Sequence, residues 1–147
     1  GFYITYKAHP DTPFSSILMK KFADVIVIDP FETIYDQCDC LIFTHCKTST
    51  FGYALLTKQP IVLIDLPEIS WDPIARDAVK TRCKMVSGTY KNGIINISDE
   101  KLISAIKRSR KNISYDVIRR YALWVILKKT YDMKVLTPPK KMDGMNL

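Results

Sequence analysis

Short segments that are apolar at every position recur along this chain, and helix-start signals lie between them. The clearest segments are residues 25–28, 40–43 and 61–64, and the signals include Thr12-Pro13 and Asp72-Pro73. Continuous apolar runs of this length are typical of strands in a parallel sheet whose two faces are both covered. An N-cap residue followed by proline is typical of the first turn of a helix. The alternation predicts an α/β protein.

We expect strands at residues 3–6, 25–28, 40–44, 61–64, 85–86 and 94–97, and helices at residues 13–22, 30–37, 48–57, 73–81, 115–131 and directly after Ser98. Strands that alternate with helices predict a doubly wound, mostly parallel, Rossmann-like sheet of five or six strands with helices on both faces. We divide the 147 residues into a Rossmann-like domain (1–111), a C-terminal helix that packs on it or on a second domain (112–134) and a flexible tail (135–147). Because the chain begins at Gly1 and enters a strand at once, we expect it to be part of a larger protein.

A cluster of hydroxyl residues follows the apolar run 40–43 and opens the next helix. Thr48, Ser49 and Thr50 supply hydroxyl groups as well as backbone N–H groups, and Gly52 allows a ligand to approach closely. A helix N-terminus carries unpaired N–H groups and a positive dipole end, which favours a phosphate. One of the three hydroxyls is needed to cap the helix, and the other two predict a phosphate site.

Further polar residues follow the other predicted strands, where ligands bind in sheets of this kind. Lys7, His9 and Pro10 follow the first strand, and a histidine there can donate to a phosphate or act as an acid toward a leaving group. A structural role for His9 and a solvated Lys7 are the alternatives.

Asp29, Thr44 and Asp65 end their strands in the same way and are candidates to contact a sugar or a base. Asp29 with Glu32 also has the spacing of a capping box, and Asp65 could instead order its loop.

The formal net charge is +7, and the excess lies mostly after residue 100. This balance favours anionic partners: nucleotide phosphates, nucleic acid or an acidic membrane surface. The four cysteines do not have the arrangement of a metal cage, so we expect no metal and reduced thiols in a cytoplasmic protein. The first residues, GFYITY, have neither the charged start nor the small-residue cleavage site of a signal peptide, and no apolar stretch approaches the ~20 residues that a membrane span requires, so we expect a soluble protein.

These motifs together resemble the C-terminal, donor-binding domain of GT-B glycosyltransferases that build bacterial surface polysaccharides of the capsule type. The resemblance covers about residues 3–108 and rests on Lys7-x-His9-Pro10, on Asp29-Pro30 after a buried strand, on the segment 38–65 and on the segment INISDEKLISAI. It implies that His9 and Pro10 match an HP motif whose histidine contacts the donor phosphate. It also implies that residues 48–50 match a Ser/Thr motif that binds the same phosphate.

The resemblance further implies an N-terminal acceptor-binding domain as partner and no activity for this chain alone. His9 would then be catalytic, because it stabilises the nucleotide as it departs. Many enzymes of this class that use UDP- or ADP-linked donors hold the ribose with a glutamate early in the helix, whereas this chain has residues 51–54, FGYA. A CMP- or CDP-linked sugar is therefore favoured over a UDP-linked one, with no other cofactor.

The residues leave other functions open. A basic α/β module that binds nucleic acid or another phosphate ligand is the main alternative, although no nucleic-acid-binding signature supports it. We also expect that the basic C-terminal residues could hold the enzyme at the inner face of a membrane.

Overall fold

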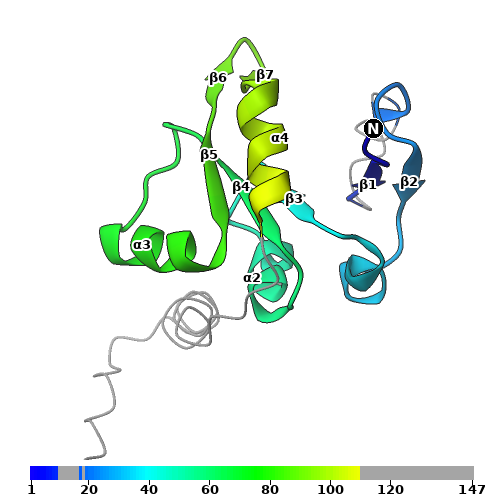
Figure 1. Ribbon diagram of the computed structural model, residues 1–147, viewed down its shortest axis with the longest axis horizontal. Coiled ribbons are helices and arrows are strands. Elements are labelled where there is room, and N and C mark those ends of the chain that lie inside the picture. The colour runs from blue at the N-terminus through cyan, green and yellow to red at the C-terminus, as the bar shows by residue number, and fades with distance from the viewer. Residues whose placement is uncertain (10–16, 18, 110–147) are drawn as a thin grey trace, which may run out of the picture.

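The computed structural model describes residues 1–9, 17 and 19–109 of the chain, and it is a mixed α/β structure. Its strands are β1 (Thr5–Lys7), β2 (Val25–Val27), β3 (Leu41–Phe43), β4 (Ile61–Asp65), β5 (Lys84–Ser87), β6 (Thr89–Lys91) and β7 (Ile94–Asn96). Its helices are α2 (Ser49–Leu56), α3 (Pro73–Arg82) and α4 (Asp99–Arg108), with 3₁₀ turns η1 (Phe31–Thr33) and η2 (Tyr35–Gln37). Figure 1 shows the arrangement.

A parallel sheet with the order β3-β4-β5 forms the centre of the described structure. The side chains of β4 alternate between its two faces, as they must in an extended strand. Ile61 and Leu63 pack with α2 and α3, whereas Val62 packs with α4. Ile61, Val62 and Leu63 are at most 1% exposed. This sheet therefore has helices on both faces, which explains why its central strand is apolar at every position.

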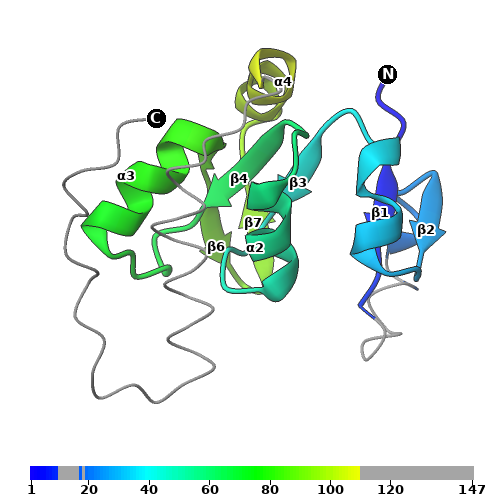
Figure 2. The same ribbon diagram turned by 90° about the horizontal axis from the view of Figure 1, so that it is seen from below.

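The β1-β2 pair is also parallel, but it forms a sheet of its own. All three residues of β2 are only half-buried, and Ile28, which follows it, is 72% exposed. Several large apolar side chains of this part of the chain are exposed as well: Phe2, Tyr3, Ile4, Ile17 and Phe22. In both views β1 lies between β2 and the three-stranded sheet (Figures 1 and 2).

The sequence predicts one sheet of five or six strands, and the described structure does not show such a sheet. The strands form three sheets, and β6 and β7 are antiparallel. The strand β6 is not among the predicted strands, and only Asn92 and Gly93 separate it from β7. Both residues have positive φ values, 52° and 79°, as a two-residue hairpin loop requires.

The helix predicted at residues 30–37 is replaced by the turns η1 and η2. Pro30 is extended (φ −52°, ψ 139°), and no side chain caps η1. Asp29 therefore does not cap a helix, and the capping-box interpretation of Asp29 and Glu32 is wrong. Among the described residues, no helix is long and apolar enough to cross a membrane. The predicted helix at 115–131 and tail at 135–147 lie outside the described residues, as do residues 13–16 and 18 of the helix predicted at 13–22.

Candidate functional site

The start of α2 has the geometry that its sequence predicts. Thr48 is extended, and its Oγ1 accepts a hydrogen bond from the Phe51 N–H at 3.1 Å. Thr48 and Ser49 are exposed, and Thr50 is half-buried. Helix geometry leaves the N–H groups of Ser49 and Thr50 without a partner inside the helix. The start of α2 therefore presents two N–H groups and two hydroxyls that are not used for capping.

The rest of α2 is fixed to the sheet. Phe51 is completely buried, and its ring meets that of Phe43 edge-on with centroids 5.2 Å apart. Because Phe43 ends β3, this contact places the start of α2 at the carboxyl end of that strand. Thr44, the first residue after β3, is exposed there.

Gly52 is not required by packing. A Cβ added at this position would meet nothing within 4 Å in the described structure, and Gly52 is half-buried rather than buried. A glycine in a helix costs about 0.5–1 kcal/mol relative to alanine. Gly52 therefore stands beside open space, and the close approach of a ligand to it stays a prediction.

The predicted residues after β1 lie on the other parallel sheet. The Lys7 ammonium donates to the carbonyl of Ala8 and, at 3.4 Å, to that of Ile28. Lys7 thus joins the carboxyl ends of β1 and β2 instead of standing free in solvent. His9 is exposed, and Pro10 lies outside the described residues. Asp29 is exposed after β2.

The structure therefore divides the predicted phosphate site into two parts. Lys7 and His9 belong to the β1-β2 sheet, whereas Thr48, Ser49, Thr50 and Gly52 belong to the sheet that contains β3. Both parts follow the carboxyl end of a parallel strand.

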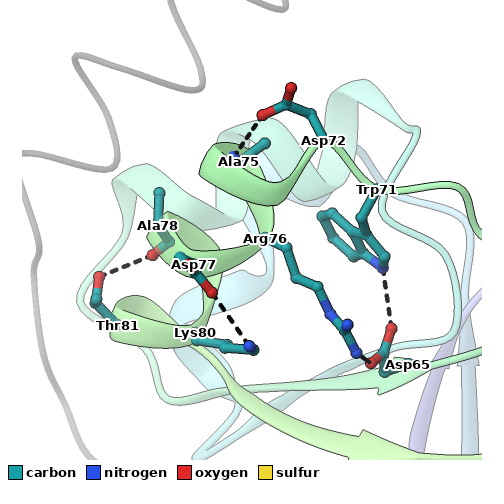
Figure 3. Close-up of polar contacts among 9 residues, drawn as sticks. All are labelled: Asp65, Trp71, Asp72, Ala75, Arg76, Asp77, Ala78, Lys80 and Thr81. Carbon is teal, nitrogen blue, oxygen red and sulfur yellow. Dashed lines mark hydrogen bonds and ion pairs between the residues drawn. The ribbon is translucent and has the colours of Figure 1, made fainter.

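Asp65, at the end of β4, is held by two side chains that the sequence analysis did not single out. Trp71 donates its indole N–H to Asp65 Oδ1 at 2.9 Å, and Arg76 forms an ion pair with Oδ2 (Figure 3). The Asp65 side chain is only 10% exposed. Asp65 thus orders the loop before α3, as the alternative interpretation expected. The residues between Asp65 and Arg76 follow no periodic pattern that would have indicated these contacts.

A cavity of about 300 Å³ lies beside this cluster. It is lined by Ile69, Trp71, Pro73, Arg76, Asp77 and Lys80. The adjacent helix α3 is capped by Asp72, which accepts a hydrogen bond from the Ala75 N–H at 3.0 Å, and Pro73 occupies its first turn. Arg76 projects from α3 toward Asp65 at the end of β4 (Figure 3).

The four cysteines are separate free thiols. Burial raises the pKa of Cys83 to about 12, and burial also raises the pKa of Cys38, Cys40 and Cys46. A thiol with a raised pKa is a poor nucleophile at neutral pH. Within residues 1–9, 17 and 19–109, no group of three or more His, Cys, Asp or Glu residues is arranged to hold a metal ion.

Comparison of the chain with protein-family models, with curated proteins and with solved structures finds no match.

Proposed function

We propose that this chain is the donor-binding half of a GT-B-type glycosyltransferase of surface polysaccharide synthesis, and that it binds a nucleotide-activated sugar. The exposed start of α2 carries the proposal. Its hydroxyls and N–H groups lie at the carboxyl end of a parallel strand, where ligands of doubly wound sheets bind. Turnover requires an N-terminal acceptor-binding domain, so the chain alone is inactive.

In this proposal the first residues of α2 have different roles. Thr48 caps the helix, so its hydroxyl is already used. A phosphate of the donor accepts hydrogen bonds from the N–H and hydroxyl groups of Ser49 and Thr50, and it approaches the backbone at Gly52. Charge-assisted hydrogen bonds of this kind are about twice as strong as neutral ones.

His9 has the catalytic role in this proposal. It donates to the phosphate that leaves with the nucleotide, so that it stabilises negative charge as the bond to the sugar breaks. Lys7 supports this end of β1 by joining it to Ile28. We favour a CMP- or CDP-linked donor, because residues 51–54 lack the glutamate that UDP- and ADP-dependent enzymes of this class carry early in the helix.

This function requires the two parallel sheets to lie side by side as one sheet. The β1-β2 and β3-β4-β5 sheets are parts of one doubly wound sheet, whose order reverses between β1 and β3. Both sheets are parallel, and the described pairings leave one edge of β1 and one edge of β3 without a strand partner. The reversal point of such a sheet is where its ligand binds. Lys7 and His9 would then lie on one side of the donor and Ser49 and Thr50 on the other.

We place the enzyme in the cytoplasm, at the inner face of a membrane. The net charge of +7 favours an acidic lipid surface. Lys128, Lys129, Lys140 and Lys141 would make this contact in our proposal, and all four lie outside the described residues.

Titration with CMP, CDP and UDP, followed by amide NMR shifts, tests the function. We expect shifts at residues 48–52, larger with CMP and CDP than with UDP. The start of α4 is a matched control, because Ser98 caps it but Asp99 and Glu100 in its first turn repel a phosphate. An unchanged spectrum with all three nucleotides, or equal shifts at both helix starts, would contradict specific phosphate binding at α2.

A further inference from the structure

The cavity beside Trp71 has the size of a site for one small ring. Its volume of about 300 Å³ is at the lower end of the range of roughly 300–1,000 Å³ found for small-molecule sites. Its lining residues belong to the loop after β4 and to α3. Ile69, Trp71 and Pro73 supply an apolar part of its wall.

The Trp71 side chain is held in position before any ligand arrives. Its indole N–H is bonded to Asp65 Oδ1 at 2.9 Å, and Asp65 is held in turn by Arg76. A ring held in this way gives up little conformational freedom when a ligand packs on it. The aromatic surface of this cavity is therefore preorganised.

The charged groups of the wall are paired. Arg76 is paired with Asp65, and Lys80 with Asp77 at 3.1 Å, so the cations and carboxylates balance. An anion consequently gains little attraction from this wall. The side chains of Arg76, Asp77 and Lys80 are 43%, 76% and 51% exposed, so they can still hydrogen-bond a neutral ligand.

We propose that this cavity binds one neutral pyranose ring. The C–H face of the ring packs on Trp71, and its hydroxyls accept from Arg76 and Lys80 and donate to Asp77. A hydroxyl both donates and accepts, so it matches a wall that offers both cations and carboxylates. A nucleobase would use the indole face but far fewer of these charged groups.

We take the ring to be the sugar of the donor, and this step rests on the proposed function. β3 and β4 are neighbouring parallel strands, paired from Leu41–Ile61 to Phe43–Leu63. Their carboxyl ends therefore lie on the same edge of the sheet, with the start of α2 after one and Trp71 after the other. In this proposal the phosphate of the donor lies at α2 and its sugar lies beside Trp71.

Saturation-transfer NMR of the 147-residue chain with methyl pyranosides of glucose, galactose and N-acetylglucosamine tests this site. We expect transfer to the C–H protons of at least one of these rings. Trp71→Ala should weaken binding about tenfold through loss of the aromatic contact. Trp71→Phe, which keeps a ring without the N–H, should retain a measurable part of the signal. Tyr90→Ala is the matched control, because Tyr90 is an exposed aromatic on β6 outside the cavity, and it should change nothing.

The outcomes separate this site from the proposed function. If CMP shifts residues 48–52 but no pyranoside receives saturation, the sugar site is wrong and the donor-binding function stands. If pyranosides bind through Trp71 but no nucleotide shifts these amides, the cavity binds sugar and the donor-binding function is wrong. Saturation of cytidine that Trp71→Ala abolishes, without any pyranoside signal, would show a base site and overturn the proposal. A pyranoside signal that Trp71→Ala leaves intact would overturn it as well.

Discussion

The two parallel sheets of this protein differ in how well their strands are buried. In the β3-β4-β5 sheet, the central strand is covered by α2 and α3 on one face and by α4 on the other. In the β1-β2 sheet, every residue of β2 is partly exposed. Burial of apolar surface is worth about 25 cal/mol per Å², so the first sheet carries most of the stability of the described structure. The part of the proposed phosphate site at α2 therefore lies on the more stable sheet, and the part that contains Lys7 and His9 lies on the less stable one.

Matched truncations in the two sheets should show this difference most strongly. Leu63→Ala removes a completely buried side chain from β4, and we expect it to cost about 2–5 kcal/mol of unfolding free energy. Ile26→Ala, in the half-buried β2, should cost about 1 kcal/mol. Urea denaturation followed by circular dichroism measures both. Equal losses would mean that β1-β2 is as well packed as the central sheet.

Arg82 gives a second measure of how the central sheet is held. This buried side chain donates to the carbonyls of Thr57 and Gln59, both at 2.7 Å, and so ties the end of α3 to the segment between α2 and β4. Arg82→Ala leaves both carbonyls without this donor and should cost about 2–4 kcal/mol.

Lys80→Ala is its control, because Lys80 lies on the same helix and is exposed. It should cost less than about 0.5 kcal/mol. If Arg82→Ala and Lys80→Ala have the same midpoint of urea denaturation, the buried guanidinium has no role in joining these segments.

The cap of α2 tests the part of the central sheet that carries the proposed site. Thr48→Ala removes the acceptor of the Phe51 N–H and should cost about 1 kcal/mol, whereas Thr48→Ser keeps an oxygen there and should cost much less. Thermal unfolding of the two variants checks this. A Ser variant as unstable as the Ala variant would show that the hydroxyl does not cap the helix.

The same contrast explains what could be predicted from the sequence. The starts of α2, α3 and α4 were predicted, because each cap residue binds an N–H only three residues further along the chain. The cap residues are Thr48, Asp72 and Ser98. The strands of the central sheet were predicted as well, since burial on both faces requires continuous apolar runs. These features are determined locally or by composition.

The features that were not predicted depend on contacts between residues far apart in the sequence, or on contacts without a regular spacing. No local pattern states which strand pairs with which, and the described structure does not show the single sheet that the sequence predicts. The helix at 30–37 failed because Pro30 is extended and because Ile34 (φ −127°, ψ −16°) interrupts the segment between η1 and η2. The position of Ser49 and Thr50 in the first turn of α2 was predicted, but the contacts of Trp71 and Arg76 to Asp65 were missed because they follow no periodicity.

Gly52 offers the most direct test of the central claim that α2 binds a phosphate. A methyl group at this position meets nothing in the described structure, so Gly52→Ala should stabilise the protein by up to about 1 kcal/mol. The same methyl group would obstruct a phosphate that approaches the start of α2. The measurement is the affinity of Gly52→Ala for CMP by calorimetry, compared with the unchanged chain. Our account predicts a more stable protein that binds CMP at least about tenfold more weakly, and a more stable protein with undiminished CMP affinity would contradict it.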